Sequence, residues 1–92
     1  MRAVRVIVHG QVQGVGYRWF TRREARARAV SGWVRNRRDG TVEALLQGPE
    51  DAIDAQLAAM TAGPAHARVD ELTTSDAAAE PGLTGFEIRP TA

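Results

Sequence analysis

The order of strand-like and helix-like patterns limits this chain to a small number of folds. Apolar side chains alternate in some segments and recur with the helical period in others, because successive strand residues face opposite sides whereas a helix repeats about every 3.6 residues. Glycine, proline and aspartate mark the breaks between these segments. We expect strands over residues 3–9, 31–37, 41–47 and 68–75, helices over 17–29 and 49–62, and a short last strand over 86–89.

Two strand–helix–strand units joined by the tight turn Arg38–Gly40 predict an α+β fold. This β-α-β-β-α-β order with a short extra C-terminal strand is typical of the ferredoxin-like α/β sandwich. Its antiparallel sheet of four strands would carry both helices on one face. Because no linker or internal repeat divides the chain, residues 1–92 are expected to form a single domain.

The two helices have different end signals. The first begins directly after a glycine-rich segment, with Tyr17 and Phe20 as its expected core residues. The second begins at Gly48-Pro49-Glu50-Asp51, where proline suits the first turn and the acids suit the positive end of the helix dipole. It ends at Gly63-Pro64. The expected buried stripe of the second helix is Ile53, Leu57 and Met60.

Composition excludes several kinds of chemistry. The chain has 92 residues, 43% of them hydrophobic and 25% charged, which is typical of a folded globular protein. It has no cysteine, so disulfides, thiolate zinc sites and cysteine nucleophiles are excluded. His9 and His66 have no metal-ligand spacing, and no metal or cofactor is expected. No apolar run approaches the roughly 18 residues that span a bilayer, so we expect a cytoplasmic protein with no membrane partner.

Charge is divided unevenly along the chain. Residues 1–40 contain ten arginines and two acidic residues, whereas residues 41–92 contain two arginines and nine acidic residues. The use of arginine to the exclusion of lysine is typical of a GC-rich genome, but the clustering is a separate observation. A basic half indicates an anionic partner such as a phosphate, a carboxylate or a nucleic acid.

The most informative segment is Gly10–Arg18, which joins the first strand to the first helix. At such a junction several backbone N–H groups point the same way at the positive end of the helix dipole, and glycines let the chain close around a phosphate. The segment is not a P-loop, because it has no lysine, nor a dinucleotide-binding fingerprint, because Trp19 stands where glycine or alanine is needed. The residues alone also allow a purely steric role for the glycines.

Two side chains near this segment are candidate site residues. Arg18 lies in the first helical turn, where a cation opposes the dipole unless an anion is close, and a guanidinium can hold two phosphate oxygens. Arg22 and Arg23 are better explained as a solvated helix face. Asn36, at the end of its strand, either starts the following turn or positions a water or substrate. No catalytic triad or carboxylate pair can be assembled around them.

Gly10-Gln-Val-Gln-Gly-Val-Gly-Tyr-Arg18 closely resembles the first signature of the acylphosphatase family. Gly32–Asn36, continuing to Asp39–Glu43, resembles the second. The segments Gly48-Pro49, Ala67–Val69 and Gly85–Ile88 are also similar, in the same order and at matching spacings. At Arg28-Ala29 the chain departs from small bacterial members, which often have Leu-Gly there, and glycine is the easy residue for a left-handed helix cap.

The resemblance implies a metal-free hydrolase that splits the mixed anhydride of a carboxylic acid and phosphoric acid without a covalent intermediate. It implies that Asn36 orients the attacking water and that inorganic phosphate is a product or inhibitor. Nothing demands more than a monomer, and a free-standing chain favours the small enzyme over the similar domain of larger carbamoyl-transfer maturation proteins. The resemblance also implies that the phosphoryl group is bound by the Arg18 side chain and by the backbone N–H groups of Gln13, Gly14, Val15, Gly16, Tyr17 and Arg18.

The alternative is a nucleic-acid-binding module, because ferredoxin-like sheets also form RNA-recognition domains. The arginine-rich half, with Tyr17, Trp19 and Trp33 nearby, has the basic and aromatic residues that such a module needs. However, the third strand lacks the aromatic pattern of RNA-binding sheets, and the acidic half would repel a long polyanion. We therefore expect no nucleic-acid partner.

Overall fold

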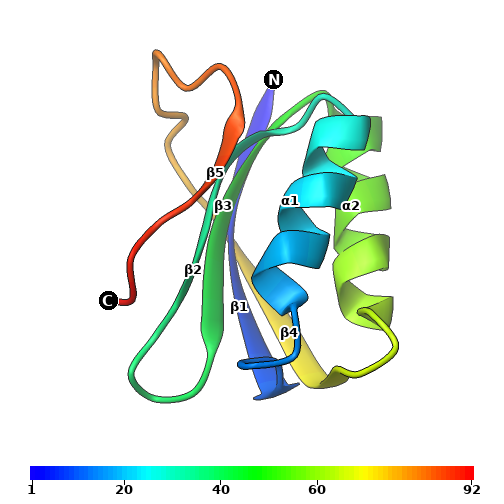
Figure 1. Ribbon diagram of the computed structural model, residues 1–92. Coiled ribbons are helices and arrows are strands. Elements are labelled where there is room, and N and C mark those ends of the chain that lie inside the picture. The colour runs from blue at the N-terminus through cyan, green and yellow to red at the C-terminus, as the bar shows by residue number, and fades with distance from the viewer.

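The computed structural model describes residues 1–92 and contains two helices and five strands (Figure 1). Their order confirms the predicted β-α-β-β-α-β arrangement with its short C-terminal strand. The elements are β1 (Arg2–Gln11), α1 (Tyr17–Ala27), β2 (Ser31–Asn36), β3 (Val42–Gly48), α2 (Glu50–Ala62), β4 (Arg68–Asp76) and β5 (Phe86–Ile88).

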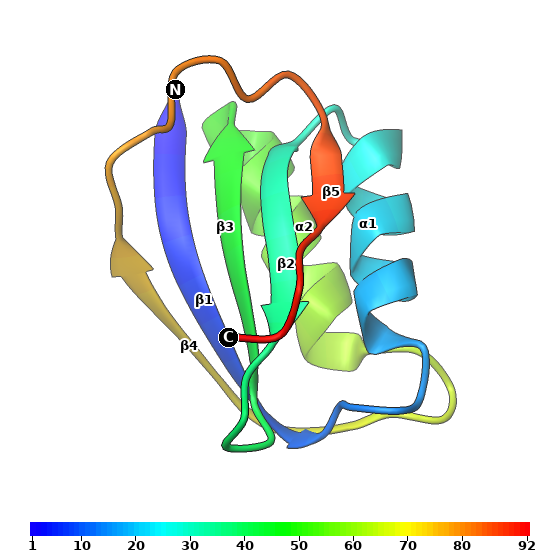
Figure 2. The ribbon, with the colours of Figure 1, turned by 60° about the vertical axis from the view of Figure 1, so that its left-hand side comes forward.

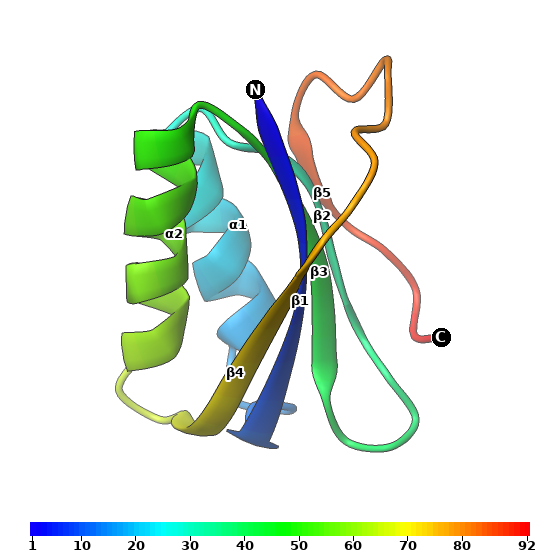
Figure 3. The same ribbon diagram turned by 180° about the vertical axis from the view of Figure 1, so that it is seen from behind.

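The strands form one sheet in the order β4-β1-β3-β2-β5 (Figure 2). Strands β1 to β4 pair antiparallel, as predicted, and β5 adds a fifth strand that runs parallel to β2. Both helices pack on the same face of the sheet. Figure 3 shows this arrangement from behind the view of Figure 1. The other face has no helix on it, so the sheet has a covered face and an open face.

Alternation along the strands decides which side chains reach the covered face. Val4, Val6 and Val8 of β1 are almost fully buried there. Their partners in β3 are Leu46, Ala44 and Val42. The hydroxyl of Tyr17 in α1 donates a hydrogen bond of 2.6 Å to the Met60 carbonyl in α2, so the helices are also tied to each other.

The first helix ends two residues earlier than predicted, at Ala27. Ala29 takes a left-handed conformation with φ of 55°, although it is not a glycine. The Val30 N–H donates to the Ala25 carbonyl at 2.9 Å and the Ala29 N–H donates to the Arg26 carbonyl at 3.3 Å. These two bonds are those of a Schellman cap, so alanine here occupies the position that glycine usually fills.

The prediction for the buried residues of the helices is partly wrong. Ile53, Met60 and Tyr17 are fully buried as expected, but Leu57 and Phe20 are only half-buried. Gln56 is fully buried instead, because α2 packs against α1 as well as against the sheet. Its Nε2 donates to the Thr21 carbonyl of α1 at 3.1 Å, whereas its Oε1 is buried without a hydrogen-bond partner.

Candidate active site

The β1–α1 loop and the β2–β3 hairpin lie at the same end of the sheet (Figure 2). The side chain of Gln13 joins them, because its Nε2 donates to the Arg37 carbonyl at 2.7 Å and to the Thr41 carbonyl at 2.8 Å. The same hairpin is closed by the Arg37 N–H, which donates to the Thr41 carbonyl. Gln13 therefore fixes the loop against the hairpin that follows directly after Asn36.

The loop is bent by two glycines in left-handed conformations, Gly14 with φ of 73° and Gly16 with φ of 80°. A Cβ atom at either position would meet no other atom within 4 Å, so glycine is needed for the backbone angle and not for space. Left-handed residues that alternate with ordinary ones turn successive N–H groups toward one concave side, which is the geometry of an anion-binding nest.

The N–H groups of this loop have no acceptors within the protein. Residues 13–16 donate no backbone hydrogen bond, and the donors of Tyr17 and Arg18 belong to the first turn, which has no intrahelical partners. Gly16 provides no side-chain cap, and the first turn contains no acidic residue. The positive end of the α1 dipole is therefore not compensated by the chain itself.

Arg18 is half-buried in this first turn and has no partner in the protein. It makes no ion pair and no side-chain hydrogen bond, whereas Arg23 pairs with Glu24 at 3.4 Å. Arg22 lies over the Trp19 ring, 4.2 Å from its centre. The interpretation of Arg22 and Arg23 as surface residues thus fits their contacts, while the Arg18 guanidinium keeps all its donors available.

Asn36 is the last residue of β2 and shares the covered face of the sheet with Val34. Its backbone is held on both sides, by the pairing with Val42 of β3 and by the Ala92 N–H, which donates to the Asn36 carbonyl at 3.1 Å. Its side-chain Oδ1 is buried and has no hydrogen-bond partner. An unpaired buried acceptor costs about 1–3 kcal/mol and, like the unpaired Oε1 of Gln56, adds nothing to stability; the Oδ1 of Asn36 is thus free to accept a hydrogen bond from a bound molecule.

Two ionisable groups near the site have structural roles. Asp39 accepts hydrogen bonds from Thr41 Oγ1 at 2.6 Å and from the Thr41 N–H at 3.0 Å, which lower the pKa of the Asp39 carboxyl and close the hairpin turn. Burial raises the pKa of the Tyr17 hydroxyl far above its ordinary value, so this group does not exchange protons near neutral pH. Tyr17 can therefore contribute its backbone N–H but not acid–base chemistry.

No cluster of three or more His, Cys, Asp or Glu side chains could hold a metal ion. None of the helices combines the length and the apolarity needed to cross a membrane.

The sequence prediction missed the side chain of Gln13, for which only the backbone N–H was expected to matter. Its partners lie more than twenty residues along the chain, and the only available signal was that an amide side chain can bridge two carbonyls.

The fold is a small α/β sandwich, and its first strand and first helix are joined by a glycine-bent loop whose N–H groups have no acceptor in the protein. Residues 4–88 match the family model of acylphosphatase, and the chain belongs to the acylphosphatase family. It is thus a hydrolase of the class that acts on acid anhydrides, and the nucleic-acid-binding alternative is not favoured.

Individual relatives agree with this assignment over almost their whole length. The chain is 49% identical to an acylphosphatase of Azorhizobium caulinodans over 88 residues, which is 96% of this chain and 95% of the relative. It is 49% identical to one of Rhodospirillum rubrum over 90 residues, 98% of each chain. The crystal structure of an acylphosphatase from Bacillus subtilis superposes with a TM-score of 0.92 at 39% identity, covering 97% of this chain and 99% of the other.

Proposed function

We propose that the β1–α1 loop binds the phosphoryl group of an acyl phosphate and that a water molecule held by Asn36 attacks it directly. The products are a carboxylate and inorganic phosphate, and no covalent enzyme intermediate forms. The observation that carries this proposal is the run of N–H groups at residues 13–16, which have no acceptor in the protein and adjoin an uncompensated helix N-terminus.

The N–H groups of the loop and the guanidinium of Arg18 would each bind oxygens of the phosphoryl group. The N–H groups of the nest surround an anion from one side, at the positive end of the α1 dipole. Arg18 would hold two oxygens at once through its planar guanidinium, since no carboxylate of the protein competes for it. Both kinds of donor would stabilise the negative charge that is spread over these oxygens in the transition state.

Asn36 would orient the water. Its unpaired Oδ1 is an acceptor for one water hydrogen, which directs the oxygen lone pair toward phosphorus. Phosphoryl transfer passes through a loose transition state in which positioning matters more than proton removal, so a strong base is not required. The leaving group is a carboxylate whose acid has a pKa of about 4, so no general acid is required either.

The same residues support the remaining parts of the proposal. In many phosphoryl-transfer sites a metal ion neutralises the developing charge. Here the loop donors and Arg18 would supply that positive charge, and the enzyme would work without metal or cofactor. Inorganic phosphate, which the same loop would bind, would inhibit as a product.

We further propose that residues 1–92 act as one domain and as a monomer, without a nucleic-acid partner.

The test is hydrolysis of acetyl or benzoyl phosphate in EDTA by the wild type and by Arg18→Gln, with the spontaneous rate subtracted. Turnover that resists EDTA and is lost in the folded variant would support a metal-free site centred on Arg18. Turnover that EDTA abolishes and Mg²⁺ restores would contradict the metal-free mechanism. A folded wild type with no turnover above background would contradict the proposed function itself.

A further inference from the structure

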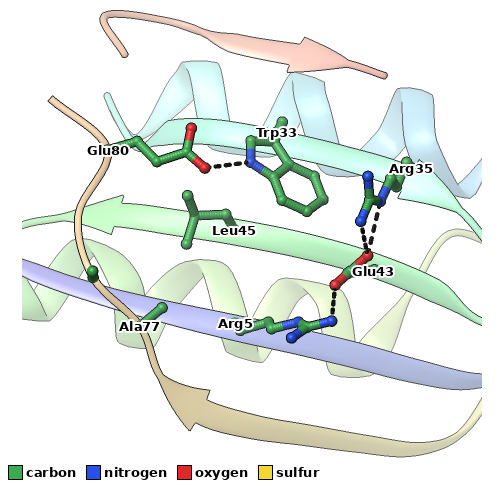
Figure 4. A pocket seen from close by; sticks show the side chains of 8 residues that line it. Arg5, Trp33, Arg35, Glu43, Leu45, Ala77 and Glu80 are labelled. Atoms are coloured by element: carbon green, nitrogen blue, oxygen red, sulfur yellow. Dashed lines mark hydrogen bonds and ion pairs between the residues drawn. The ribbon is translucent and has the colours of Figure 1, made fainter. Parts of the chain in front are cut away.

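The open face of the sheet has a pocket of about 300 Å³ over the central strand β3 (Figure 4). Because side chains alternate along β2, Arg35 points to this face whereas Asn36 points to the covered one. The pocket is thus separated from the proposed active site by the sheet. Its lining includes Arg5, Trp33, Arg35, Glu43, Leu45 and Glu80.

At one end of the pocket, two arginines hold a single carboxylate. Arg35 Nε donates to Glu43 Oε1 at 2.8 Å, and its Nη2 forms an ion pair with the same oxygen at 2.7 Å. Arg5 pairs with Glu43 Oε2 through Nη2. Only 2% of the Glu43 side chain is exposed. Burial alone would raise the pKa of Glu43, but the hydrogen bonds and charges of Arg35 and then Arg5 outweigh it and lower the pKa. The ionised trio therefore has a net positive charge.

Stability alone does not explain this trio. Of the trio only Glu43 is buried, and replacing an ion pair that contains a buried charge by apolar residues is often neutral or stabilising, because removing charges from water offsets their attraction. The Arg5 guanidinium also has N–H donors without an acceptor, since its side chain is half-exposed and makes no hydrogen bond apart from its pairing with Glu43. Its remaining N–H groups are available to a second anion at the same end of the pocket.

Away from the trio, the pocket is lined by apolar side chains and by Glu80, and hydrogen bonds and charges hold these side chains in place. Leu45 lies in the middle of this part of the pocket, with the indole of Trp33 on one side of it and Ala77 on the other (Figure 4). Trp33 Nε1 donates to Glu80 Oε1 at 3.3 Å, and the Arg89 guanidinium lies 5.0 Å from the ring centre. Glu80 occupies the end of the pocket away from Arg5 and lies 3.7 Å from Arg89, so its charge is partly neutralised.

We infer that this pocket binds a small organic carboxylate with an apolar body. The carboxylate would lie beside Arg5 and Arg35, where the positive charge is in excess, and the body would contact Leu45, Ala77 and the edge of Trp33. Charge-assisted hydrogen bonds to a guanidinium give such a site its preference for an anion, and the apolar side chains give it a preference for a hydrocarbon body. This site is independent of the proposed hydrolysis.

The test uses benzoate as the probe and Trp33 as the reporter. The chain has two tryptophans, so a Trp19→Phe background leaves Trp33 as the only one. Benzoate should change the Trp33 fluorescence saturably in the millimolar range, whereas benzamide, which lacks the charge, and acetate, which lacks the body, should bind at least about tenfold more weakly. In the same background Arg5→Gln should weaken benzoate binding at least about tenfold, since it removes one charged donor and leaves Glu43 paired with Arg35. Arg22→Gln, on the other side of the molecule, is the matched control and should change nothing.

Amide chemical shifts of the wild type provide a second measurement that needs no variant. Benzoate should shift residues around Arg5, Arg35 and Glu43, and saturating inorganic phosphate should not reverse these shifts. Three results would overturn the inference: no saturation at tens of millimolar benzoate, equal binding of benzamide, or displacement of benzoate by phosphate. The last result would place benzoate in the β1–α1 loop instead.

Discussion

The two helices pack side by side on one face of the sheet, but their ends are built differently. Helix α2 begins after Pro49 with Glu50 and Asp51 in its first turn, and Asp51 accepts a hydrogen bond from the Ala52 N–H at 2.9 Å. Helix α1 begins after Gly16 with no side-chain cap, no acid in its first turn and a cation at Arg18. The N-terminal donors of α2 meet charges of its own chain, whereas those of α1 do not.

The C-terminal ends of the two helices also differ, because a glycine ends one and an alanine follows the other. Helix α2 ends at Gly63 with φ of 70° and ψ of 170°, a conformation that is essentially restricted to glycine. Helix α1 is followed by Ala29, which takes a left-handed conformation with a Cβ atom. A missing cap and an unfavourable charge each destabilise a helix by roughly 0.3–2 kcal/mol. In the proposed function, an anion bound at the N-terminus of α1 would offset this cost.

The largest expected effect comes from removing the cation at this N-terminus. Arg18→Gln should lower kcat/KM for an acyl phosphate by about 10²–10³, the scale of losing one donor to an oxyanion. Arg22→Gln, one turn further along α1, is the matched control and should leave kcat/KM nearly unchanged. Steady-state kinetics on both folded variants decides the point. Equal losses would mean that the general charge of α1 matters and not the position of Arg18.

A second substitution separates water positioning from phosphate binding. Asn36→Ala should lower kcat at least about tenfold, because orienting the water matters only during the reaction. The inhibition constant of inorganic phosphate should change much less, since the N–H groups and Arg18 are intact. Turnover and phosphate inhibition are measured on the same preparation. Unchanged kcat with weakened phosphate inhibition would make Asn36 a ligand contact instead.

The fold could be predicted from the sequence because each element carries its own periodicity and its own end signals. The contacts that lock the site could not, because they depend on register between distant strands. The bond from Gln13 to the Arg37 carbonyl needs the loop and the hairpin to meet at one end of the sheet. The trio on the open face similarly requires that Arg5, Glu43 and Arg35 align across three strands.

Candidate residues within one motif were easier to predict than their surroundings. Arg18 and the loop glycines follow one another along the chain, so a strand-to-helix junction already suggests their meeting with an anion. Whether Asn36 would have a free side chain was open, because a turn-forming asparagine binds its own backbone. The structure shows no such bond for Oδ1, and the catalytic role of this residue stays a prediction.

Two glycines with positive φ and open surroundings allow a comparison of conformation with function. Gly16 has φ of 80° and Gly82 has φ of 93°, and a Cβ atom at either would meet nothing within 4 Å. Alanine at either position should lower the free energy of unfolding by about 1–2 kcal/mol, because a left-handed conformation is unfavourable for a residue with a Cβ atom. Only Gly16 belongs to the proposed anion-binding loop.

Phosphate distinguishes the two variants. A ligand that binds only the folded state stabilises it in proportion to its affinity, so urea unfolding with and without inorganic phosphate reports binding. Gly82→Ala should gain as much stability from phosphate as the wild type does, and Gly16→Ala should gain less. Equal gains in both variants would show that the backbone shape at Gly16 is not needed to hold the anion.

The smallest expected effect concerns the other end of α1. Ala29→Gly should raise the free energy of unfolding by about 0.5–1 kcal/mol, because relief of the left-handed strain exceeds the added flexibility of the unfolded chain. Ala27→Gly, inside the last turn, is the matched control and should lower it by about 0.5–1 kcal/mol. Urea midpoints at constant slope measure both changes. Because position 29 follows the helix end opposite Arg18, kcat/KM should stay the same in Ala29→Gly. A destabilised Ala29→Gly would mean that the alanine side chain contributes packing that outweighs its backbone strain, and the contrast between the two helices would then apply to their N-termini alone.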